Sequence, residues 1–391
     1  ALDLMPIEWD YGPDAAVNND TQAETAKRLW EETGDVSTEV GGDTLGMLAD
    51  SDRVITSEYH RPYETHVRME PINATVAIYE DRVDVWSPTQ NQATPIMLVA
   101  DQLGRDTRDI HVNTVFLGGA FGGNGGGNTA VTRQAAEIAR QVGRPVKVIW
   151  TREEDIAQDK QRPPVHTRLS ASMGDNGLPD AFFSRAVWFT QNAAERIGPA
   201  TADVSINTMP YQVPNRRHER HNVAAHIPTA THRGPGANQN GFIIEQYADE
   251  LALAGDWDPL EWRIEMTKGL EPWQRVLLRL KEVAGFTTDL PRGQGMGIAV
   301  VEDHAAYCGA CATVSVSRRG EVRVEKVVLV HNPGYIVIPS GAIDQLEGSV
   351  CYELSHALYG GLNIQDGRVV NTNYDSYNLM RMPQALSLIH I

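Results

Sequence analysis

The sequence predicts an α+β fold in which mixed sheets pack against helices. Three observations favour this class: apolar and polar residues alternate in several separate segments, other segments have helical spacing, and the two patterns do not follow the regular strand–helix order of a parallel α/β protein. The 391 residues, 41% of them hydrophobic and 22% charged, suffice for two or three domains with hydrophobic cores.

Residues 1–50 are interpreted as the tail of an upstream domain and a connecting segment. A polar stretch rich in Glu and Lys predicts a surface helix at 21–33, and Gly41-Gly42-Asp43 marks a turn into a short second helix. Because the chain starts without methionine, in what we interpret as the middle of a strand, we expect the natural protein to begin further upstream.

Residues 51–160 are predicted to form a first α+β subdomain. Alternating apolar residues, in segments bounded by prolines, predict strands. Apolar residues at helical spacing, each set followed by a glycine, predict two helices. The strands are expected at 54–59, 75–79, 83–86, 110–117 and 145–150, and the helices at 96–103 and 134–142.

Residues 161–385 are predicted to form a second, incomplete α+β region. A helix is expected at 241–254, and Asp258-Pro259 opens another because proline suits the first helical turn. Strands at 311–316 and 322–330 and a helix at 343–359 are expected to follow. The final LSLIHI (386–391) lacks cap or turn signals and is interpreted as the translated scar of a sequencing adapter, with a genuine apolar tail as the alternative.

The acidic composition limits the classes of partner. A net charge of −17 argues against nucleic acid, since phosphate binding needs a basic surface. An anionic ligand would have to be held by backbone N–H groups. The three cysteines, Cys308, Cys311 and Cys351, cannot supply the four thiolates of an iron–sulfur cluster, so any such cluster is expected on another chain or domain.

The strongest local signal is the glycine run at 118–123, which follows an apolar strand and is extended by Asn124 and three more glycines. Glycine lets consecutive N–H groups converge on an anion and lets a flat ligand approach the backbone. The run lacks the Gly-Lys-Ser/Thr of a phosphate-binding P-loop, and its match to a dinucleotide motif is weak. A binding loop and a flexible turn are therefore both compatible with these residues.

Two polar clusters are further candidates. SPTQNQ (87–92) stands where a strand ends and a helix begins, so its amides and N–H groups are placed to hold a ligand, although a simple helix N-cap explains it equally simply. THRGPG (231–236) is a turn that carries one cation and a histidine, and is either a ligand loop or only a turn.

Other features favour structural roles. Cys308 and Cys311 have redox-like spacing but run into a strand instead of a helix N-terminus, which argues against a lowered thiol pKa. His218 and its basic neighbours are interpreted as a solvated surface patch. Glu245 and Glu250 are interpreted as surface or structural charges of a helix, not as an acid–base pair.

Seven segments in order resemble the molybdenum-binding region of xanthine-oxidase-type enzymes. Together they cover nearly the whole chain, and the first and fourth are most like the branch of isoquinoline 1-oxidoreductase and membrane-bound aldehyde dehydrogenase. The segments are RMEPINAT (68–75), SPTQNQ (87–92), FLGGAFGG (116–123), GRPVKVIWTREED (143–155), THRGPG (231–236), EQYADELA (245–252) and DQLEGSV (344–350). Their common order is more specific than any one of them.

The resemblance implies which residues contact the cofactor. It assigns a glutamine near the molybdenum oxo group, a loop against the molybdenum and pterin, a second cofactor loop and backbone around the active site. These are, respectively, Gln90; Gly119, Ala120, Phe121 and Gly122; His232, Arg233 and Gly234; and Gly348 and Ser349. No protein ligand to the metal is expected, because the pterin dithiolene and non-protein ligands hold it. Ala120 and the extension from Asn124 depart from the family loop.

The resemblance also implies a function. We expect a fragment of the large subunit of a molybdenum-dependent hydroxylase, which oxidises an aldehyde or N-heterocycle with water-derived oxygen. Its expected cofactor is molybdenum–molybdopterin in the cytosine dinucleotide form, and its expected partners are a small iron–sulfur subunit with [2Fe-2S] clusters and a cytochrome c acceptor, with the bacterial periplasm favoured. The alternative is a non-catalytic cofactor-binding or scaffold homologue.

The catalytic residue is not assigned within this sequence. The family's base is a glutamate in a Gly-Glu-Pro-Gly-like segment, which this chain does not contain, and MRMPQA (380–385) resembles the stretch that precedes it. We therefore expect the glutamate beyond the chain end, and we expect the 391-residue chain itself to be inactive.

Overall fold

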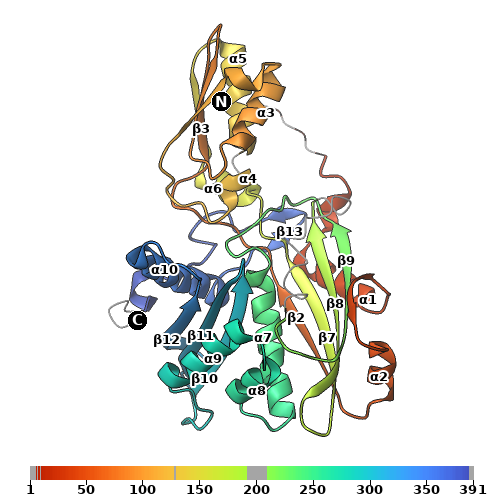
Figure 1. Cartoon of the computed structure of the whole chain (residues 1–391). Helices are drawn as coiled ribbons and strands as arrows, with labels where there is room; N and C mark the ends of the chain where they lie inside the picture. The colour runs from red at the N-terminus through yellow and green to blue at the C-terminus, as the bar shows by residue number, and fades with distance from the viewer. Residues whose placement is uncertain (1–5, 7, 9, 127–128, 192–208, 387–391) are drawn as a thin grey trace.

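The computed structural model describes residues 6, 8, 10–126, 129–191 and 209–386, so the predicted adapter scar lies almost wholly outside the described residues. Within this part the chain forms a four-stranded sheet with two helices, which stands apart from a larger body built around a five-stranded and a three-stranded sheet (Figure 1). The mixed sheets and packed helices confirm the predicted α+β class.

The four-stranded sheet has the order β5-β4-β3-β6, with β4 and β5 parallel and the other pairs antiparallel. Helices α3 and α5 pack on it and enclose a core that includes Val76, Val85 and Ala135. Helix α3 ends at Gly104, whose φ of 62° gives the left-handed C-cap that glycine favours. The elements are β3 (Asn73–Ile78), β4 (Val83–Ser87), α3 (Ala93–Leu103), β5 (Ile110–Thr114), α5 (Thr129–Val142) and β6 (Val146–Ile149).

The five-stranded sheet has the order β1-β9-β8-β7-β2, in which only β8 and β9 run parallel. Helix α2 packs against β7, β8 and β9, while α7 packs against β2 and β7. Phe182, Tyr247 and Trp262 belong to the core between the sheet and α7. The elements are β1 (Asp35–Val40), α2 (Thr44–Asp50), β2 (Val54–Arg61), β7 (Val165–Met173), β8 (Pro179–Thr190), β9 (Asn215–Ala224) and α7 (Ala237–Ala254).

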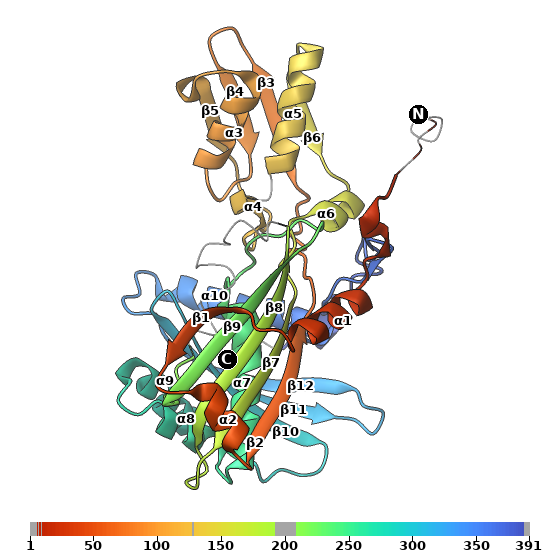
Figure 2. The ribbon, with the colours of Figure 1, turned by 90° about the vertical axis from the view of Figure 1, so that its right-hand side faces the viewer.

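The three-stranded sheet β10-β11-β12 is antiparallel and lies on the other side of α7 (Figure 1). Its elements are α8 (Pro259–Met266), α9 (Glu271–Ala284), β10 (Gln294–Asp303), β11 (Ala306–Val316), β12 (Val322–Asn332) and α10 (Pro339–Leu358). The remaining elements are α1 (Asn19–Leu29), α4 (Gly123–Gly126), α6 (Arg152–Gln158), β13 (Ile364–Gln365), β14 (Arg368–Val369) and short 3-10 helices at Pro13–Ala16, Thr107–Asp109 and Met382–Gln384. Figure 2 shows α1 and α2 beside the five-stranded sheet. No helix in the described ranges has both the length and the apolar character needed to cross a bilayer.

Most predicted elements are confirmed within a few residues, but the strands of the large sheet were missed. Strands β7 and β8 are buried on both faces, so they lack the alternation that marks a half-buried strand. The interpretation of His218 as a solvated patch was wrong, because this residue lies in β9 with its side chain buried and its Nδ1 2.7 Å from Oγ of Ser184. The division at residue 160 stays a prediction, although β2 pairs with β7 across it.

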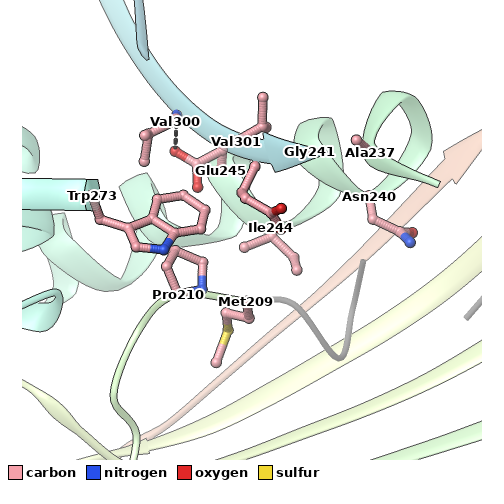
Figure 3. A pocket seen from close by; sticks show the side chains of 11 residues that line it. Met209, Pro210, Ala237, Asn240, Gly241, Ile244, Glu245, Trp273, Val300 and Val301 are labelled. Atoms are coloured by element: carbon pink, nitrogen blue, oxygen red, sulfur yellow. Dashed lines mark hydrogen bonds between the residues drawn. The ribbon is translucent and has the colours of Figure 1, made fainter. Parts of the chain in front are cut away.

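A buried ion pair joins α7 to α8 and β10. The Arg263 guanidinium is fully buried, and its Nε and Nη1 donate to Glu245 (2.9 Å) and Asp249 (2.6 Å). Glu245 also accepts from the backbone N–H of Val300 at 2.9 Å, beside a cavity of about 20 Å³ that has room for a single water (Figure 3). Glu245 is therefore a structural charge.

Replacing Arg263 with leucine is expected to lower the free energy of unfolding by about 3–5 kcal/mol, because the variant leaves the Glu245 carboxyl buried without its counter-charge. Urea denaturation followed by tryptophan fluorescence measures this loss. The control is Arg275→Leu, which removes an exposed ion pair with Glu271 in α9 and should change stability little. Equal losses in the two variants would contradict the assigned role of Arg263.

Candidate functional site

The glycine run between β5 and α4 turns sharply. Gly119, Phe121 and Gly122 have positive φ angles of 96°, 53° and 103°, a conformation that glycine adopts easily and phenylalanine rarely. Such a phenylalanine persists only where its surroundings hold it in place. Here its ring stacks on that of Tyr352 in α10, with 4.2 Å between the centroids.

The run is packed closely against two other segments. A Cβ added to Gly122 would lie 2.7 Å from the carbonyl oxygen of Thr231, and one added to Gly123 would lie 2.3 Å from Nη1 of Arg68. Both distances are too short for a side chain, so glycine is required by close packing. This packing does not fit the flexible turn that the sequence left open.

Asn124 fastens the glycine run to the SPTQNQ segment. Its Nδ2 donates to the carbonyl oxygen of Pro88 at 2.7 Å, and its own carbonyl oxygen accepts from the backbone N–H of Gln90 and the Thr89 hydroxyl, both at 3.3 Å. In turn, Oδ1 of Asn124 accepts from Nη1 of Arg68 at 2.6 Å. The residue that departs from the family loop therefore has a structural role here.

Arg68 and Asp159 form the buried anchor beneath this junction. Nη2 of Arg68 donates to Oδ1 of Asp159 at 2.6 Å, and Nδ1 of His66 lies 2.7 Å from Oδ2 of the same carboxylate. Burial alone would raise the pKa of Asp159, but the charges of His66 and Arg68 outweigh burial and hold that pKa below its usual range. Asp159 is therefore ionised at neutral pH.

Most of the predicted cofactor residues line one cavity of about 490 Å³. Its wall comes from the SPTQNQ segment, the glycine run, the 231–236 turn and α10. The lining residues are Gln90, Ala120, Phe121, Gly122, His232, Arg233, Pro235, Asp344, Gln345 and Gly348. A Cβ on Gly348 would meet no atom within 4 Å, so a ligand can approach the backbone of α10 there.

Three predicted residues do not line this cavity. Gly234 and Ser349 instead line a larger, mainly apolar cavity of about 1040 Å³, which shares Arg233 and Gln345 with the first. Gly119 packs against the ring of Phe121 and the Cβ of Arg68. The assignment of all ten residues to cofactor binding stays a prediction, which we take up as a proposal below.

Sequence reasoning missed Tyr352, which ties the 231–236 turn to the rest of the site. Its hydroxyl lies 3.0 Å from Nε2 of His232, and the Arg233 guanidinium lies over its ring at 6.0 Å. Arg233 also donates to the carbonyl oxygen of Gln345 at 3.1 Å. The only signal for Tyr352 was its place two residues after the DQLEGSV segment (344–350).

Replacing Gly122 with alanine is expected to lower stability by about 1–3 kcal/mol, because the added Cβ meets Thr231 at a positive φ. Thermal unfolding and limited proteolysis of the loop measure the effect. The matched control is Gly125→Ala, where the nearest atom to a Cβ is Oε1 of Gln90 at 4.0 Å, and this variant should remain close to wild type. A stable, protease-resistant Gly122→Ala protein would show that the loop is not packed as described.

Comparisons with known proteins agree with this geometry. The chain is 26% identical over 377 residues to a nicotinate dehydrogenase chain of Pseudomonas putida, an alignment that covers 88% of this chain and 31% of that protein. It is 24% identical over 338 residues to the beta chain of isoquinoline 1-oxidoreductase of Brevundimonas diminuta, an alignment that covers 83% of this chain and 43% of that protein. The chain thus spans less than half the length of these two relatives.

The fold is shared with a solved structure and two family models. Quinoline 2-oxidoreductase from Pseudomonas putida 86 superposes with a TM-score of 0.80 at 13% identity, over 91% of this chain and 72% of that one. Two models, each described as a molybdopterin cofactor-binding domain, match residues 26–266 and 272–385. Because the first model alone matches more than half of the residues, this chain belongs to the molybdopterin cofactor-binding family of the xanthine oxidase type.

Proposed function

We propose that this chain is the cofactor-holding part of the large subunit of a molybdenum-dependent hydroxylase that oxidises an aldehyde or an N-heterocycle. The observation that carries the proposal is the cavity of about 490 Å³, where four separate segments of a molybdopterin-binding family member converge. When bound, the cofactor supplies the two-electron redox chemistry, and the protein supplies orientation and electrostatics.

The lining residues fit the expected group. The side-chain amide of Gln90 offers a neutral donor for an oxo group, and the tightly packed backbone at 120–122 admits a flat pterin. Arg233 supplies a cation for a phosphate in a chain whose net charge is −17. This donor set supports a pterin dinucleotide, for which we propose the cytosine form. Gly119, Gly234, Gly348 and Ser349 complete the proposed cofactor-contacting set.

The adjoining apolar cavity is the proposed approach for substrate. It shares Arg233 and Gln345 with the cofactor cavity and is lined elsewhere by apolar side chains such as Phe242, Val301 and Leu346. An apolar pocket with few polar groups suits a small aromatic or aliphatic molecule. Both substrate classes, the N-heterocycle and the aldehyde, fit this chemistry.

Electron transfer is proposed to need a second protein chain. Cys308, Cys311 and Cys351 are free, and burial raises the pKa of Cys308 to about 11, so this thiol stays protonated and is a poor ligand. An iron–sulfur cluster takes four thiolates, which these three cysteines do not supply. We therefore assign the [2Fe-2S] clusters to a small partner subunit, with a cytochrome c as the further acceptor.

Replacing Gly348 with leucine tests the cofactor site. The leucine side chain should fill the cavity from α10 and abolish retention of molybdenum and pterin, while the helix itself gains about 1 kcal/mol from losing a glycine. Mass spectrometry of the metal and chromatography of the released nucleotide measure retention and identify the base in chains purified from a host that makes the cofactor.

The matched control is Gly341→Leu in the same helix, which lies outside the cavity and has only ordinary contacts with Ile338. This variant should keep the wild-type cofactor content. Wild-type retention in Gly348→Leu would show that the cofactor binds elsewhere. Release of a nucleotide other than the cytosine form would contradict only the proposed form of the cofactor.

A further inference from the structure

Three buried side chains converge behind the wall of the cofactor cavity. Glu64 follows β2, His232 lies in the 231–236 turn, and His356 lies in α10, with exposed fractions of 1%, 2% and 4%. One ligand atom from each, two imidazole nitrogens and a carboxylate oxygen, lies within 4.8 Å of the other two. The cluster is not part of the cofactor site, although His232 contributes to both.

The hydrogen bonds of Tyr352 decide which nitrogen of His232 carries a proton. The Tyr352 hydroxyl lies 3.0 Å from the carbonyl oxygen of His66 and 3.0 Å from Nε2 of His232. A carbonyl oxygen only accepts, so the single hydroxyl proton is donated to His66. Nε2 of His232 must then donate to the hydroxyl oxygen. Burial lowers the pKa of His232, so the ring is neutral and Nδ1 is a bare acceptor.

His356 reaches the same state through its own helix. Its Nδ1 lies 3.0 Å from the carbonyl oxygen of Tyr352, one turn earlier in α10, so Nδ1 carries the hydrogen. Burial lowers the pKa of His356, which leaves Nε2 as a bare acceptor. Neither this Nε2 nor Nδ1 of His232 has a hydrogen-bond partner among the described residues, although the Thr65 backbone adjoins both rings.

Glu64 is the anion of the cluster. Its carboxylate pairs with Arg61 at 3.0 Å and with Arg162 at 2.6 Å. Burial alone would raise the pKa of Glu64, but these two cations outweigh burial and lower it, so the group is ionised. A carboxylate has about four lone-pair positions, which leaves acceptor capacity beyond the two arginines.

Three acceptors without a donor between them are unfavourable in a buried site, because each forgoes the hydrogen bonds it makes in water. We propose that a divalent transition-metal ion of the Zn²⁺ class binds between Glu64, His232 and His356. Two neutral imidazoles and a carboxylate, with a fourth position for water, are a common Zn²⁺ ligand set. The other nitrogen of each ring is already held by a hydrogen bond, as is usual for ligating histidines.

The proposed ion has a structural role. It would join the segment after β2, the 231–236 turn and α10, and so fix His232 where this residue lines the cofactor cavity. The rival occupant is one buried water, whose two hydrogens would satisfy both imidazoles. The positive charge of Arg162 favours the water, while the carboxylate and the bare ring nitrogens favour the metal.

The test is metal content. The 391-residue chain is stripped with a chelator and dialysed against Co²⁺ or Zn²⁺, and bound metal is measured by mass spectrometry and by the visible absorption of Co²⁺. One ion per chain is expected, whether or not molybdenum is present. His356→Asn should abolish this binding. His166→Asn, which changes a buried histidine that stacks on His60 away from the cluster, should retain it.

Wild-type protein that takes up no more Co²⁺ or Zn²⁺ than His356→Asn would overturn the proposal and assign the cluster to a water. If His356→Asn fails to fold, X-ray absorption at the zinc edge of the wild-type protein decides. Two nitrogen ligands at about 2.0–2.1 Å with carboxylate oxygen support the site, whereas sulfur ligands or water alone contradict it.

Discussion

The site depends on the buried interaction between Arg68 and Asp159. These two side chains join the segment before β3 to the end of α6, and through Asn124 they hold the glycine run against the SPTQNQ segment. A buried guanidinium is tolerable only with its anion in place, so loss of either group would leave an unpaired charge beneath the cavity. The close packing that demands glycine at 122 and 123 exists because this anchor brings the backbones together.

The second half of the cavity comes from the larger body of the molecule. Helix α10 presents Tyr352 to both Phe121 and His232, while Arg233 reaches back to Gln345. Aromatic stacking and two hydrogen bonds therefore connect the glycine run to the body around α7 and the three-stranded sheet. The proposed cofactor is held between parts of the chain that lie more than two hundred residues apart, which makes its binding sensitive to the docking of α10.

The sequence predicted the parts of this structure that depend on local signals. Helices with glycine ends, such as α3, and half-buried strands such as β3 were located, and the motif resemblance selected residues that line one cavity. Strands β7 and β8 were missed because burial on both faces removes the alternating pattern. Glu64, Tyr352 and His356 were missed because their environment is created by tertiary contacts, and a lone histidine or glutamate in a helix carries no such information.

A molybdenum cofactor is proposed to bind in the cavity built on the Arg68–Asp159 anchor. The most direct measurement is a crystal structure of the chain isolated with its cofactor, with anomalous scattering recorded at the molybdenum edge. We expect a single molybdenum peak in the cavity lined by Gln90, Phe121 and Gly348. A peak elsewhere on the chain, with this cavity filled only by solvent, would contradict the proposed site.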